Sequence, residues 1–184
     1  TPTLSSPEYQ VPLTVNETTI LRAVAFAPNQ LPSDVMTQTY VFLSDVIRQS
    51  PQNERPDESW PEPNRLVTKG AFIDYGMDPQ IVDDPRYADE IFSALMSIPT
   101  ISLVTDLKHL FDSKTGIYAN PSGSGRTWER PVSMELIHAD GTAGFQIDAG
   151  MRIRGSSSAN LNFPKHGFRF FFRSQYGDPV LKYP

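Results

Sequence analysis

Two alternating stretches near the end of the chain decide the fold: residues 145–154 read FQIDAGMRIR, and residues 165–173 read KHGFRFFFR. In the first, the odd-numbered positions from Phe145 to Ile153 are apolar, and the even-numbered positions are mostly polar or charged. In the second, three phenylalanines alternate with three cations: Phe168, Phe170 and Phe172 with Lys165, Arg169 and Arg173. Because successive side chains of a strand point to opposite faces, each stretch predicts a strand with one apolar and one cationic face.

Antiparallel pairing of these two strands would gather five cations on one face of the sheet: Arg152, Arg154, Lys165, Arg169 and Arg173. Like charges directly opposite one another destabilise a ladder, so this face requires an anionic partner. The partner could be a phosphate or the acidic remainder of the chain. Residues 1–144 hold ten Lys/Arg and nineteen Asp/Glu, a net charge of −9, whereas residues 145–184 hold six and two, a net charge of +4.

A third strand is predicted over residues 132–136, with a turn at Asp140-Gly141 leading into the first. Residues 100–104 predict a short buried strand, after which Asp106 is expected to cap a single helical turn. The glycine- and serine-rich residues 116–126 are expected to form an exposed loop.

One longer helix is expected before these strands. Asp84-Pro85 is a favourable helix start, and Pro99 disfavours helical geometry at the residue before it. Between them a single apolar stripe runs through Tyr87, Ile91, Leu95 and Ile98.

The first part of the chain predicts a small β module with strands near residues 20–26 and 35–42. The residues TILRAVA at 19–25 and TYVF at 39–42 resemble the β-sandwich module of chitobiases and hexosaminidases, also called the fibronectin-III-associated repeat. That resemblance implies a non-catalytic spacer or carbohydrate-proximal module. The polar, proline-rich residues 49–65 then predict a semi-rigid linker, in which the Trp60 ring packs on the following domain.

Five segments together resemble the opening of the CotH (spore-coat kinase-like) domain: residues 98–103 (IPTISL), 116–120 (GIYAN), 128–136 (WERPVSMEL), 150–158 (GMRIRGSSS) and 164–169 (PKHGFR). Members of this family are atypical kinases that use ATP and a divalent metal. The resemblance implies that Arg154, Gly155, Ser156, Ser157 and Ser158 lie near the nucleotide phosphates. It also implies that Lys165 pairs with a phosphate and that Glu135 is a possible partner of this lysine.

Two departures from the family pattern limit this expectation. Members often carry arginine soon after the serines, where this chain has Ala159 and Asn160. The carboxylates that orient the acceptor and hold Mg²⁺ lie downstream in the family, beyond residue 184. We therefore expect an internal piece of a longer secreted or envelope protein, with no catalytic residue and no metal ligand of its own and no phosphoryl transfer when isolated.

Several other classes are disfavoured. The chain has no cysteine, its three histidines lie 28 or more residues apart, and no run is apolar enough for a membrane span. Nucleic-acid binding is not expected at a net charge of −5.

The predicted fold class is α+β, a small N-terminal β-sandwich module followed by the antiparallel-sheet part of an atypical kinase-like domain. The expected units are residues 1–44, a lead-in over 45–84, and 85–184. Two functions remain open: a nucleotide-facing kinase part, or a non-enzymatic surface module that meets a protein or glycan and whose cationic hairpin is structural. In the first case, part of the layer covering the three phenylalanines would lie downstream, which would leave residues 145–184 the least stable region.

Overall fold

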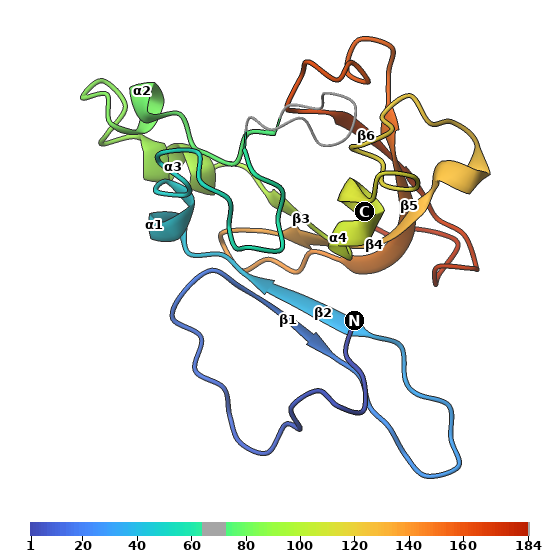
Figure 1. Ribbon diagram of the computed structural model, residues 1–184. Helices are drawn as coiled ribbons and strands as arrows, with labels where there is room; N and C mark the ends of the chain where they lie inside the picture. The colour runs from blue at the N-terminus through green and yellow to red at the C-terminus, as the bar shows by residue number, and fades with distance from the viewer. Residues whose placement is uncertain (64–72, 184) are drawn as a thin grey trace.

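The computed structural model describes residues 1–63 and 73–183, and this part of the chain is mostly β, with two antiparallel sheets and few helices. A two-stranded ribbon consists of β1 (Thr19–Ala23) and β2 (Met36–Tyr40). The larger sheet has four strands in sequence order: β3 (Thr100–Val104), β4 (Arg130–Ile137), β5 (Gln146–Arg154) and β6 (Gly167–Phe171). In Figure 1 the ribbon lies on one side of this sheet, and α4 (Leu107–Phe111) with the loops after it lies on the other.

The register confirms the predicted alternation in the last two strands. β5 and β6 pair antiparallel, with Met151 opposite Phe170 and Ile153 opposite Phe168. The same register sets Arg152 directly opposite Arg169. The apolar and cationic faces expected from the sequence are therefore the two faces of the sheet.

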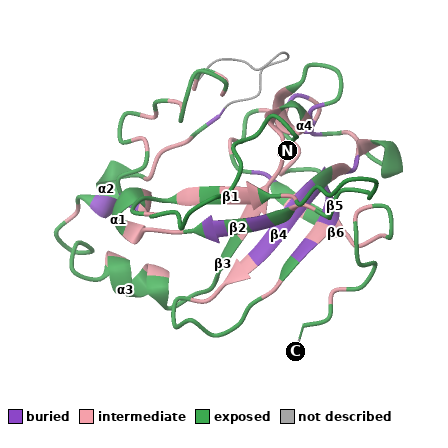
Figure 2. Cartoon of the chain, turned by 90° about the horizontal axis from the view of Figure 1, so that it is seen from below, coloured by how far each residue is buried: buried purple, intermediate pink, exposed green. Residues whose placement is uncertain are grey.

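One face of the sheet forms the core. Its centre is a cluster of buried residues: Ile117, Val132, Ala149, Met151 and Ile153. In Figure 2 the buried positions concentrate on β2, β4 and β5. Phe168, Phe170 and Phe172 are partly buried and pack against this cluster.

Part of the layer covering these phenylalanines comes from upstream in the chain. Leu110 of α4 and Tyr118 pack on the same cluster, and Ile117 lies at its centre with 2% of its surface exposed. Burial of an aromatic side chain stabilises by roughly 1.5–3 kcal/mol. The hairpin is therefore held by contacts within the chain itself.

The loop predicted to be exposed supplies part of this core. Within residues 116–126, Ile117 and Ala119 are buried. Two backbone bonds of 2.9 Å hold the segment on α4, from Ile117 N to His109 O and from Tyr118 N to Leu110 O. The segment is rich in glycine and serine, so its overall composition predicts a loop although Ile117 and Ala119 belong to the buried core.

The predicted helix is much shorter than expected. After the short helices α1 (Leu43–Val46) and α2 (Pro79–Val82), residues 85–90 form turns and only α3 (Ile91–Met96) is helical. The apolar stripe finds little to pack against, since Ile98 is 62% exposed. Helical stability in proteins comes mainly from packing an apolar face, so the pattern alone does not extend the helix.

Further contacts join the remaining segments. Trp60 packs on Phe111 of α4 and on Tyr75, with ring centroids 5.7 and 5.6 Å apart, as the expected packing role for this ring requires. A single 3₁₀ turn (Arg126–Trp128) precedes β4. No helix in residues 1–63 or 73–183 is long and apolar enough to cross a membrane.

Candidate functional site

The face of the sheet opposite the core, called the polar face here, carries the candidate site. Its residues alternate with the core positions along each strand: Ser102 on β3, Ser133 and Glu135 on β4, Gln146, Asp148, Gly150, Arg152 and Arg154 on β5, and Arg169 and Phe171 on β6. Along β5 the chemistry changes from amide and carboxylate to arginine, which separates two regions of one face.

At the arginine end, Arg152 and Arg169 lie opposite each other in the ladder. The centroid of the Phe171 ring lies 4.8 Å from the guanidinium carbon of Arg152 and 5.1 Å from that of Arg173. Among the residues that the structure describes, no carboxylate lies within ion-pair distance of Arg152 or Arg169. These two arginines therefore remain available to an anion.

Arg173 is the exception among the five predicted cations. Its guanidinium makes two 2.9 Å bonds to both carboxylate oxygens of Glu129, whose side chain is 1% exposed. These hydrogen bonds, helped by the charge of Arg173, hold the pKa of Glu129 below its usual value although burial acts against this. One of the five cations, Arg173, therefore has an acidic partner within the chain, as one of the two interpretations of the cationic face predicts.

The loop between β5 and β6 forms a closed turn beside these arginines. Gly155 has a φ of +100°, a left-handed conformation that favours glycine. Ala159 N donates to Gly155 O at 3.2 Å, and the Ser158 hydroxyl donates to Arg154 O. Within the described chain, the backbone N–H groups of residues 156–158 have no acceptor, so they can donate to an added anion.

His166 fixes this loop from below, a role that the sequence did not suggest. It is 8% exposed, packs edge-on against Tyr118, and its Nδ1–H donates to Ser158 O. Lys165 precedes it, is exposed and has no ion pair within the described residues. The structure therefore brings Arg154, the serine loop and Lys165 to one end of the hairpin.

Glu135 is not part of this group, which corrects its suggested pairing with Lys165. Glu135 lies opposite Gln146, at the other end of β5 from Arg154. Its carboxylate accepts hydrogen bonds from Thr39 N at 2.8 Å and from the Gln38 side-chain amide. A further hydroxyl pair, Thr39 and Ser102, lies 2.7 Å apart. Glu135 therefore holds the ribbon on the sheet.

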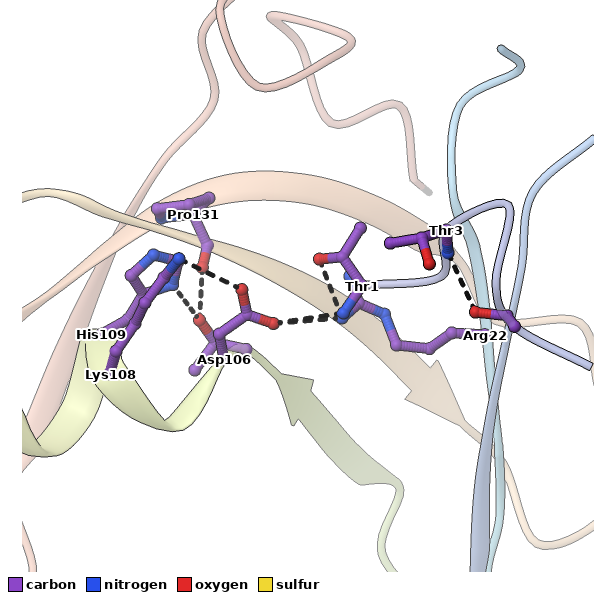
Figure 3. Close-up of polar contacts among 9 residues, drawn as sticks. Thr1, Thr3, Arg22, Asp106, Lys108, His109 and Pro131 are labelled. Atoms are coloured by element: carbon purple, nitrogen blue, oxygen red, sulfur yellow. Dashed lines mark hydrogen bonds and ion pairs between the residues drawn. The ribbon is translucent and has the colours of Figure 1, made fainter. Parts of the chain in front are cut away.

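A second junction joins the ribbon to the start of α4. The sequence predicts that Asp106 caps this helix, but its side chain makes no capping hydrogen bond. Figure 3 shows its carboxylate between the amino group of Thr1 and the side chain of Lys108, with Arg22 beside it. Its Oδ1 lies 3.5 Å from Arg22 Nη1. This tertiary pairing with β1 replaces the local capping bond.

Between the two ends of the polar face, Tyr176 lies over Gly150. A Cβ added at Gly150 would come within 2.5 Å of the tyrosine ring, so any other residue here would require the ring to shift. The Tyr176 hydroxyl is 3.4 Å from Glu129 Oε2. The turn after β6 is thereby fixed over the middle of β5.

The first part of the chain matches a known family. The Fn3-associated family model matches residues 1–40, the segment that contains β1 and β2. No curated protein and no solved structure matches the chain. The Fn3-associated segment thus supplies the ribbon that Glu135 and Asp106 hold against the sheet.

Proposed function

We propose that this chain is the nucleotide-facing, N-terminal part of a CotH-like atypical kinase domain in a secreted or envelope protein. Its β5–β6 hairpin would hold the phosphate groups. The observation that carries the proposal is the unneutralised pair Arg152 and Arg169, set opposite each other by the register. Such a pair disfavours the ladder unless an anion lies across it.

The loop supplies the second element of the proposed phosphate site. Free N–H groups at residues 156–158 lie between Arg154 and Lys165, the pattern of donors and cations that phosphate oxygens accept. Arg154 and Lys165 would add charge, and the N–H groups would fix orientation. His166, buried beneath Ser158, keeps the donors in place before a ligand arrives.

The family's cofactors would be ATP and Mg²⁺, and the two fit this chain differently. The arginine end suits a triphosphate. The described residues contain no group of three or more His, Asp or Glu side chains that could hold a metal ion. The proposal therefore concerns binding of the phosphates alone.

Calorimetric titration with ATP, with and without Mg²⁺, tests the proposal. We expect weak binding that falls as salt rises, since exposed charges are screened. Lys165→Ala and Arg154→Ala should each weaken it, by about tenfold if a charged hydrogen bond is lost. Lys114→Ala, an exposed lysine away from the hairpin, is the matched control. Identical heats for wild type and the two hairpin variants would remove this loop from the site.

A second function is favoured by a specific observation. The three phenylalanines of the hairpin pack against a buried cluster that includes the upstream residue Ile117, so this chain itself supplies part of their cover. Together with the Fn3-associated match, this supports a non-enzymatic surface or carbohydrate-associated module in which the hairpin is structural. Slow hydrogen exchange throughout residues 145–184, with no heat on addition of ATP, would favour this alternative.

A further inference from the structure

A small pocket opens on the polar face between the ribbon, the start of α4 and the turn after β6. Its volume is about 180 Å³, enough for about six waters but too small for a nucleotide. Asp148 lies in its wall, six residues before Arg154 on β5, which corresponds to roughly 20 Å along the strand. The pocket is therefore distinct from the proposed phosphate site.

The polar groups of the pocket are of both kinds, donors and acceptors. Arg22 lines it, and the buried Nε of this side chain has no hydrogen-bond partner among the described residues. Asp148 and Asp106 offer carboxylate oxygens, and the other polar lining residues are Thr1, Thr105, His109, Ser133 and Gln175. Burial raises the pKa of Asp148, although a hydrogen bond with Ser133 and the charge of Arg22 act against this.

The pocket wall also has an apolar part. Val35 from the segment before β2 and Val104 at the end of β3 line the pocket, with Tyr176. A ligand must therefore present apolar surface to these side chains while exchanging hydrogen bonds with the charged groups.

These requirements discriminate between ligand classes. A simple anion would approach the carboxylates of Asp106 and Asp148, and a simple cation would approach the guanidinium of Arg22. A neutral polyhydroxyl compound avoids both conflicts, because each hydroxyl both donates and accepts, and its C–H faces can pack on valine and tyrosine. Such a compound can accept from the Arg22 guanidinium and donate to the Asp148 carboxylate at the same time.

We propose that this pocket binds one neutral hexose unit, either free or as part of a glycan, with Asp148 accepting from and Arg22 donating to its hydroxyl groups. Both the Fn3-associated segment, through Arg22 and Val35, and the four-stranded sheet, through Asp148, contribute to the site. The inference does not depend on the nucleotide proposal.

Amide-shift titration by NMR with glucose, galactose, mannose and N-acetylglucosamine tests it, with acetate and methylguanidinium as charged comparison ligands. One sugar unit should bind with a dissociation constant on the order of 1 mM. Asp148→Asn and Arg22→Lys should weaken binding by about tenfold or more, because the first removes the charge of an acceptor and the second removes the fixed donor geometry of a guanidinium.

The matched controls are Asp89→Asn and Arg86→Lys, which change the same residue types at exposed positions away from the pocket. Lys165→Ala should leave sugar binding unchanged, which separates this result from that of the nucleotide titration. Absence of shifts for every sugar up to about 50 mM would overturn the proposal. So would tighter binding of acetate or methylguanidinium, or sugar binding that survives both pocket substitutions.

Discussion

The two ends of β5 present one face of the same sheet, yet their charged groups are treated differently. Near Gln146, the neighbouring Glu135 carboxylate is buried beneath the ribbon and accepts bonds from Gln38 and Thr39. Near Arg154, no element covers the sheet in this way, and Arg152 and Arg169 have no carboxylate partner within the described chain. Where the ribbon covers the polar face, residues of the chain itself bind the charged group. Where the face is open, the charged groups have no carboxylate partner within the described chain.

Desolvation explains the difference. A buried carboxylate without partners costs several kcal/mol, so covering Glu135 requires the donors that β2 supplies. The exposed Arg169 and the half-buried Arg152 keep part of their hydration and tolerate the lack of a partner at a cost of tenths of a kcal/mol to about 1 kcal/mol. The covered end thus holds the ribbon on the sheet, and the open end can bind an anion.

The largest expected effect is at the covered end. Glu135→Ala removes the acceptor of Thr39 N and Gln38 and should lower the free energy of unfolding by about 1.5–3 kcal/mol, the range for hydrogen bonds to a charged group. Chemical denaturation measures this loss, with the exposed Glu8→Ala as control. A loss no greater than that of the control would mean that the ribbon is not held by this contact.

A smaller effect of opposite sign is expected at the open end. Arg169→Thr removes one of two like charges that face each other across the ladder and keeps a good strand former. It should raise the free energy of unfolding by about 0.2–1 kcal/mol at low salt, and less at high salt. Destabilisation by this substitution at both salt concentrations would show that Arg169 already has an anionic partner in the protein.

The smallest effect is expected between the two ends, at Asp148. Burial raises the pKa of this carboxyl group in the folded protein above its usual 3.8. Between these two pKa values the folded state holds a proton that the unfolded state releases, so stability falls as pH rises through this window and stays lower at neutral pH.

Asp148→Asn should remove that slope and raise the melting temperature slightly at neutral pH. Melting curves of both proteins from about pH 3 to pH 7 test this. An unchanged slope in the variant would assign the pH dependence to another group. A gain in stability combined with loss of sugar binding would mean that Asp148 is kept for the ligand rather than for the fold.

Much of the four-stranded sheet was predictable, because period-two alternation assigns each side chain of β5 and β6 to a face and fixes which residues can pair. The core's covering layer was not, because Ile117 and Ala119 lie in a segment whose composition is that of a loop. The prediction of a longer helix was wrong for the converse reason. Its apolar stripe was regular, but the stripe has little apolar surface to pack against.

The candidate site divides in the same way. Arg154, the serines and Lys165 follow one another closely along the hairpin, and chain connectivity alone brings them to one end. The partners of Glu135 lie 97 and 96 residues away, and no local pattern encodes such a contact. The same holds for the pocket, whose Arg22 and Asp148 come from different sheets.

The glycine at the middle of β5 has a consequence for how this protein tolerates mutation. Alanine at position 150 would displace the ring of Tyr176, and Gln175 and Arg173 lie one and three residues before this tyrosine in the chain. One added methyl group would therefore loosen the Glu129 ion pair and reshape the rim of the pocket together. A residue with no side chain, in contact with neither proposed ligand, would then rank among the most sensitive positions in a mutational scan.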